Sequence, residues 1–325
     1  MTKDRPARIV LQECLGLTPG QQLLIVTDDP TAGVGELLRQ EGIRLGAETL
    51  LIRMTERENS GVEPPPPVAA AMAVAQVVVL ATAKSLSHTQ ARHRACQAGA
   101  RVASMPGITE DMLNRTLGGT YEDVARRSRW LAGRLSGDQV RIITPAGTDL
   151  SFSIAGRRAQ GDDGDLTMPG AFGNLPAGEA YIAPVEGSAR GTLVVDGSMS
   201  GLGRITEPLV IRVENGLALE VQGGPQAGEL NRLLSRYGQP ARNIAELGIG
   251  TNPYARLTGA ILEDEKMLGT IHIALGDNST FGGTVQADSH LDAILLSPTV
   301  YLDGTLLMDD GRLILPEEKG EAHGL

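Results

Sequence analysis

Two histidines and a neighbouring aspartate are the clearest candidates for chemistry in this sequence. His272 lies in an alternating apolar run, and His290 stands two positions before Asp292. Side chains at positions i and i+2 of a strand point to the same face, so His290 and Asp292 would lie side by side. Each residue taken alone has a plain alternative, a core histidine or a surface His–Asp pair. Together they predict a site for zinc, manganese, cobalt or non-haem iron, because imidazole and carboxylate bind such metals.

Three glutamates are candidates for completing this site. Glu179 follows a Pro-Ala-Gly turn at the head of an expected strand, where a water-facing position is an equal alternative. Glu246 is embedded in an apolar strand, where an unpaired carboxylate would be costly. Glu265 is predicted to support the metal ligands as a neighbouring acid or to act as a general base. Its neighbours Asp264 and Lys266 are predicted to form a solvated turn.

A third histidine, His88, is predicted to approach the metal from another part of the chain. It follows the apolar run at residues 77–80, and open α/β sheets place functional groups in the loops after their strands. There His88 would serve as a base. The alternative is a surface histidine beside the N-cap of the next helix.

Composition excludes several classes of function. A net charge of −10 disfavours a nucleic-acid partner, whose phosphates would be repelled. The two cysteines, Cys14 and Cys96, provide neither a disulfide framework nor a thiolate metal site. No apolar run is long enough to cross a bilayer, and the first residues lack the apolar core of a secretory signal. We therefore expect a cytoplasmic enzyme that acts on a peptide or small-molecule substrate.

The expected elements change character near the middle of the chain. Short apolar strands alternate with helices over residues 1–137, which predicts an α/β domain with a doubly wound parallel sheet. Residues 138–325 are rich in strands and turns and predict a barrel-like, metal-binding catalytic domain. Asn215-Gly216 is typical of a two-residue hairpin turn. The prolines at 64–67 predict an extended linker, and residues 228–237 the one clear helix of the second domain.

Four motifs carry a resemblance to a known family. Residues 174–184, 246–253 and 264–276 and the His290-x-Asp292 pair resemble the thermophilic metallo-aminopeptidases of the aminopeptidase T and S types. Residues 87–89 and 105–109 resemble its shorter members, labelled leucyl aminopeptidases. The resemblance implies a homodimer with two divalent ions (zinc, cobalt or manganese) per chain. It places the family's metal ligands on Glu179, Glu246, His272, His290 and Asp292.

The resemblance favours a metallo-aminopeptidase, in which Glu265 would pass a proton to the leaving amine. Ser279 stands where longer members have a tyrosine, and the segment between the two histidines is shorter. A related branch, the 2,5-dihydroxypyridine dioxygenases, holds one iron(II) on two histidines and an aspartate and has a Ser/Thr-His-Thr element like residues 87–89. The alternative is therefore a ring-cleaving dioxygenase that uses His272, His290 and Asp292, with His88 as acid or base. A metal-stabilised binding protein is the third interpretation, and five ligands exceed what such a site needs.

Overall fold

A five-stranded parallel sheet organises the first part of the molecule. The computed structural model describes residues 5–119 and 121–314. Alternate side chains of the central strands enter two apolar clusters, one on each face of the sheet, which is why these strands are apolar throughout. The strands run in the order β2 (Glu48–Arg53), β1 (Gln22–Thr27), β3 (Val77–Ala81), β4 (Arg101–Ser104) and β8 (Phe172–Asn174).

Helices cover both faces of this sheet and supply the rest of each cluster. One face packs against α1 (Arg5–Arg8), a π-helix (Ile9–Cys14), α2 (Ala32–Arg44) and α5 (Glu110–Thr116). The other face packs against α3 (Pro66–Val74) and α4 (Gln90–Gln97). The extended linker expected at residues 64–67 is thus partly wrong. Pro66 occupies the first turn of α3, where a missing N–H costs no hydrogen bond.

Two antiparallel sheets form the second part and share one apolar core. The first runs in the order β14 (Leu217–Gln222), β13 (Leu209–Glu214), β10 (Arg190–Val195), β6 (Asp149–Ser153), β5 (Gln139–Ile143), β18 (Thr299–Leu302), β19 (Thr305–Asp309) and β20 (Arg312–Leu313). The second runs in the order β12 (Gly203–Arg204), β11 (Ser198–Met199), β17 (His290–Leu296), β16 (Thr270–Gly276), β15 (Ile244–Gly250), β9 (Glu179–Ile182) and β7 (Gln160–Asp162). The expected fold class, a parallel α/β part followed by a β-rich part, is confirmed.

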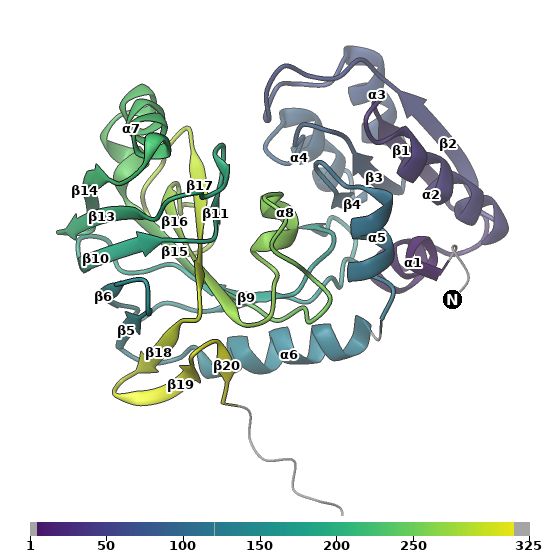
Figure 1. The fold of residues 1–325 in the computed structure, drawn as a ribbon. Helices are drawn as coiled ribbons and strands as arrows, with labels where there is room; N and C mark the ends of the chain where they lie inside the picture. Colours follow the sequence, from purple (N-terminus) through teal and green to yellow (C-terminus); the bar gives the residue numbers. More distant parts are fainter. Residues whose placement is uncertain (1–4, 120, 315–325) are drawn as a thin grey trace, which may run out of the picture.

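The remaining elements connect these layers. Helix α6 (Tyr121–Arg134) runs beneath both parts, and the short α8 (Ile261–Asp264) lies between them (Figure 1). Helix α7 (Pro225–Tyr237) and a 3₁₀ turn (Gln239–Arg242) precede β15. Asn215 and Gly216 both have positive φ in the turn between β13 and β14, as predicted.

Strand β8 ties the two parts together. It lies beyond residue 138 in the chain, yet it pairs with β4 as the edge strand of the parallel sheet. The expected division between residues 137 and 138 stays a prediction, and the chain returns to the first sheet after that point. Among the described residues, no helix combines the length and hydropathy needed to cross a bilayer.

Candidate metal centre

One face of the second antiparallel sheet carries the residues predicted to bind metal. In β16, Ile271 and Ile273 enter the shared apolar core, so the intervening His272 points to the opposite face. The neighbouring strands present their acids and imidazole to the same region. Glu179 lies on β9, Glu246 on β15, and His290 and Asp292 on β17. The order of these strands therefore brings together all five predicted ligands, which lie far apart in the sequence.

A glycine on the adjacent strand makes room for the first imidazole. Gly248 is the cross-strand partner of His272. A Cβ atom at residue 248 would overlap the His272 ring, so a side chain here would displace the imidazole. The close approach of a ring to backbone explains why this otherwise buried strand position is a glycine.

The five side chains converge at short distances. His272 Nε2 lies 3.3 Å from Glu246 Oε1 and 3.4 Å from Glu179 Oε2. His290 Nε2 lies 3.4 Å from Glu246 Oε2 and 3.2 Å from Asp292 Oδ1. Ligand atoms of Glu179, Glu246 and His272 all lie within 4.8 Å of one another. Glu179, Glu246 and His272 therefore surround one small volume that fits a divalent cation, and Glu246 connects this volume to His290 and Asp292.

Two observations indicate that this volume suits a cation. Glu179 Oε2 is buried and accepts no hydrogen bond from the described residues, an arrangement that is costly without a positive charge nearby. His290 Nδ1 donates to the carbonyl oxygen of Asp277 at 2.8 Å. This bond orients the ring and leaves Nε2 facing the carboxylates, where it can coordinate a metal once it has released its proton. The donor set therefore fits a divalent metal.

The electrostatics of the site reflect its crowded carboxylates. Burial lowers the pKa of His272, but the carboxylates of Glu246 and Glu179 outweigh burial and raise this pKa to about 9. Burial opposes ionisation of Asp292, yet the charge of His290 holds the Asp292 pKa below its usual value. The pKa of Glu265 is raised to about 8, first by burial and then by the charges of Glu179 and Asp292, against the opposing effect of Lys266. Cationic partners are thus needed to keep this cluster ionised.

The expectation that Asp264 and Lys266 form a solvated turn is wrong. Their exposed fractions are 0% and 1%. Lys266 Nζ lies 2.6 Å from Glu179 Oε1, 2.9 Å from Glu265 Oε1 and 3.1 Å from Asp162 Oδ2. Asp162, on β7, was not predicted, because it belongs to a polar, glycine-containing run that has the composition of a loop. Asp162 lies near Lys266 because β7 pairs with β9, which makes Asp162 the cross-strand partner of Glu179.

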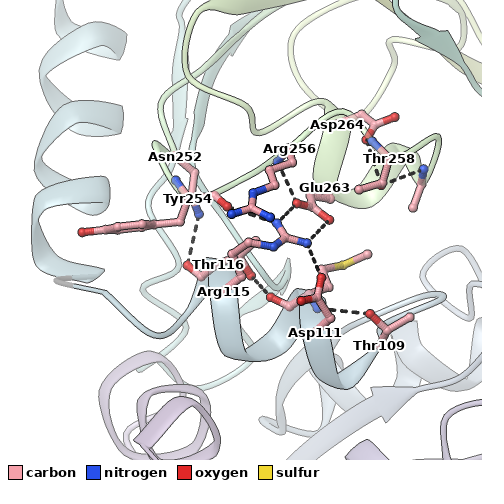
Figure 2. A network of polar contacts seen from close by, with 12 residues as sticks. Thr109, Asp111, Arg115, Thr116, Asn252, Tyr254, Arg256, Thr258, Glu263 and Asp264 are labelled. Carbon is pink, nitrogen blue, oxygen red and sulfur yellow. Dashed lines mark hydrogen bonds and ion pairs between the residues drawn. The ribbon is translucent and has the colours of Figure 1, made fainter. Parts of the chain in front are cut away.

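The segment that carries Glu265 and Lys266 is anchored to the first part of the molecule. Arg115, on α5, forms an ion pair with Glu263 of α8 and also donates to Asp111 and to the carbonyl of Tyr254 (Figure 2). Glu263 accepts a further bond from the backbone N–H of Arg256. Buried, doubly bonded ion pairs fix geometry firmly.

The next residue, Asp264, fixes the same segment from the other side. Its carboxylate accepts hydrogen bonds from Ser198 Oγ at 2.6 Å and from the backbone of Thr258 and Gly259 at 2.7 and 2.8 Å. The two acids thus hold α8, and the residues that follow it, in one position.

His88 lies in the loop between β3 of the parallel sheet and α4. The loop after β3 is held by a hydrogen bond from Ser87 Oγ to Ser104 Oγ, and Thr89 caps α4. The pKa of His88 is lowered, first by partial burial and then by the positive charges of Arg92 and His290. His88 is exposed and stands beside the N-cap of α4, the position that the alternative interpretation expected.

An aromatic side chain separates this face from a neighbouring groove. The ring of Phe281 packs edge-on against Tyr181 and His290, with ring centroids 5.7 and 5.8 Å apart. Phe281 also lines a groove of about 1140 Å³ between α6 and residues 155–161. Ser279, the position of the missing tyrosine, is exposed and bonds to Asp277 in the preceding turn. The aromatic surface next to the site is therefore formed by Phe281 together with Tyr181, which shares a face of β9 with Glu179.

Comparison with known proteins gives a consistent result. A family model described as 2,5-dihydroxypyridine 5,6-dioxygenase (NicX) matches residues 8–315. The curated 2,5-dihydroxypyridine 5,6-dioxygenase of Pseudomonas putida KT2440 is 26% identical over 197 residues. That alignment covers 55% of this chain and 55% of the relative, so the chain spans about half the length of the curated relative.

Two solved structures have the same fold. The 2,5-dihydroxypyridine dioxygenase from Pseudomonas putida KT2440 superposes with a TM-score of 0.81 at 20% identity, over 98% of this chain and 100% of the other. Wild-type AmpT from Thermus thermophilus superposes with a TM-score of 0.73 at 19% identity, over 96% and 99%. At these identities the likeness shows the fold alone. It supports a structural relation between the peptidase and dioxygenase branches.

Proposed function

Because the chain belongs to the 2,5-dihydroxypyridine 5,6-dioxygenase family, we propose that it is an oxygenase that opens a hydroxylated aromatic or pyridine ring at one iron(II) ion. The observation that carries this proposal is the convergence of two imidazoles and several carboxylates on one buried sheet face. Two histidines and one carboxylate are the ligand set of non-haem iron(II) oxygenases.

The predicted aminopeptidase activity is wrong. The family model and the curated relative both name a dioxygenase, which is an oxidoreductase, in place of a hydrolase or protease. The likeness to AmpT extends to the fold and gives no support to peptide hydrolysis. The role predicted for Glu265, proton transfer to a leaving amine, belonged to that reaction and falls with it.

In the proposed reaction, His272, His290 and Asp292 would hold the iron, and Glu246 lies between both imidazoles. Iron(II), when bound, supplies the redox chemistry with dioxygen that amino-acid side chains lack. The hydrogen bond from His290 Nδ1 to Asp277 keeps that ring oriented. We therefore propose a single iron in place of the two zinc, cobalt or manganese ions that the sequence resemblance implied, because the family is that of a dioxygenase.

His88 is the proposed proton acceptor for a ring hydroxyl. Its pKa is lowered from the ordinary histidine value, which favours the neutral imidazole that can accept a proton. Phe281 would pack against the substrate ring beside His290 and exclude water from it. The proposed substrate is a small molecule, and Tyr181, which packs edge-on against Phe281, extends the aromatic surface beside it.

Anaerobic loading with iron(II), followed by oxygen-electrode assay on 2,5-dihydroxypyridine, tests the proposal. We expect oxygen uptake coupled to loss of the ring absorbance. His290→Ala should abolish both iron binding and oxygen uptake, whereas His93→Ala, on the exposed side of α4, should retain both. Failure of the loaded protein to consume oxygen with any dihydroxylated ring would reject the proposed reaction. The predicted homodimer and cytoplasmic location stay predictions, and sedimentation analysis would test the former.

A further inference from the structure

We propose that the Lys266 ammonium acts as a built-in second cation that restricts the centre to one divalent ion. Removing it would open a second metal site formed by Asp162, Glu179 and Glu265. The inference rests on the proposed function in one respect, since it assumes that an ion binds between His272 and His290.

The ammonium of Lys266 sits where a second ion would sit. Its three nearest carboxylate oxygens belong to Asp162, Glu179 and Glu265, at 3.1, 2.6 and 2.9 Å. These acids come from β7, from β9 and from the residue after α8, so the lysine closes a pocket built from three separate segments. An ammonium group has three N–H donors, and each carboxylate can accept one.

Glu179 divides the centre into two cation positions. Its Oε1 accepts from Lys266, whereas its Oε2 faces His272 Nε2 at 3.4 Å and accepts no hydrogen bond from the described residues. A carboxylate that presents one oxygen to each of two positive charges is how two-metal centres share a bridging ligand. Here one of those charges is already part of the chain.

Lys266 cannot easily vacate this position. Its backbone carbonyl accepts from the N–H of Asn252 at 2.9 Å, and its own N–H donates to Glu263. Glu263 is in turn held by Arg115 (Figure 2). The side chain is buried among carboxylates that would be left uncompensated if it moved, and an unpaired buried charge is strongly destabilising.

The pocket vacated by the ammonium would prefer a different metal from the histidine site. Its three ligands are carboxylates only, and oxygen-rich sites favour manganese, magnesium or calcium. Metal–oxygen distances of about 2.0–2.6 Å are shorter than the ammonium contacts, so the walls would close slightly around an ion. Manganese(II) is the suitable probe, because it also binds at imidazole and carboxylate sites.

Equilibrium dialysis of the full-length protein against excess manganese(II), with elemental analysis, tests the inference. We expect one manganese per wild-type chain and two per Lys266→Ala chain. Electron paramagnetic resonance should show coupling between the two ions of the variant, since the Glu179 carboxylate alone lies between Lys266 and His272. Lys266→Arg, which keeps the charge, and Lys84→Ala, which removes a lysine elsewhere, should each bind one ion.

A double variant guards against poor folding of Lys266→Ala, which leaves three acids facing one another. Combining it with Asp162→Asn removes one buried charge and keeps Glu179 and Glu265. This variant should still bind the second ion, about 10-fold more weakly.

The outcomes separate this inference from the proposed function. Two ions in the wild-type chain, or one ion in both Lys266→Ala and the double variant, would overturn the inference and leave the iron site standing. No ion in the wild-type chain would overturn both. A second ion without magnetic coupling to the first would place it elsewhere on the surface and would also reject the inference.

Discussion

The parallel sheet and the second antiparallel sheet use their strands in opposite ways. Apolar clusters cover both faces of the parallel sheet, so its chemistry is confined to the loops, where His88 lies. The antiparallel sheet needs only one face for the core, which leaves the other for Glu179, Glu246 and His272. A sheet that packs against the core on one face can therefore hold a buried polar site on its other face. A sheet that is packed on both faces can carry functional residues only in its loops.

Breaking the contact between the two parts should have the largest effect. In the pair between Arg115 and Glu263, the side chains are 13% and 1% exposed. Arg115→Ala would leave the buried carboxylate unpaired, so we expect a loss of about 3–5 kcal/mol in the free energy of unfolding. Arg141→Ala removes a doubly bonded pair whose partners, Arg141 and Asp149, are both more than half exposed. That control should cost less than about 1 kcal/mol in urea denaturation. Equal losses would refute the argument from burial.

Crowding the polar face is the next test. Gly248→Ala would push against the His272 imidazole, and we expect about 3 kcal/mol of destabilisation together with loss of iron binding. Gly133→Ala is the matched control, because nothing described lies within 4 Å of the added methyl on helix α6. It should leave stability unchanged or raise it by about 0.5–1 kcal/mol. An iron content in Gly248→Ala equal to that of the wild type would show that His272 is not positioned by this glycine.

Removing the His88 side chain, which lies in a loop of the parallel sheet, should lower the turnover rate without loss of the metal. We expect His88→Ala to lower kcat about 100-fold at unchanged iron content, because His88 moves a proton and the strand residues bind the ion. His93→Ala should retain the wild-type kcat. Loss of iron from His88→Ala would show that His88 binds the metal and would contradict its proposed role in proton transfer.

Trimming the aromatic wall should have the smallest effect. Phe281 makes an edge-on contact with His290. Such contacts contribute about 0.5–1.5 kcal/mol, so Phe281→Ala should weaken iron affinity about 3- to 10-fold, as measured by competition with a chelator. Phe281→Leu retains apolar bulk, so its iron affinity should lie between those of the wild type and Phe281→Ala. A change of several hundred-fold would mean that Phe281 holds the site together.

The sequence predicts what depends on local pattern. Alternation in β16 and the spacing of His290 and Asp292 indicate their shared face, and the apolar surroundings of Glu246 indicate a buried acid. Lys266 and Asp162 could not be found this way. Their local sequences are polar and glycine-containing, like solvated turns, and only the packing of β7, β9 and α8 buries them. The predicted reaction, peptide hydrolysis, is wrong for a related reason. The motifs on which it rests resemble those of a peptidase family that has the same fold.

The return of β8 to the parallel sheet has a mechanical consequence. Residues 175–178 alone separate this edge strand from β9, which begins at Glu179. A movement of one part of the molecule relative to the other would therefore be transmitted through this short segment to the backbone of Glu179. Cleavage of the backbone after α6 would also leave the two fragments associated, because β8 of the second fragment pairs with β4 of the first.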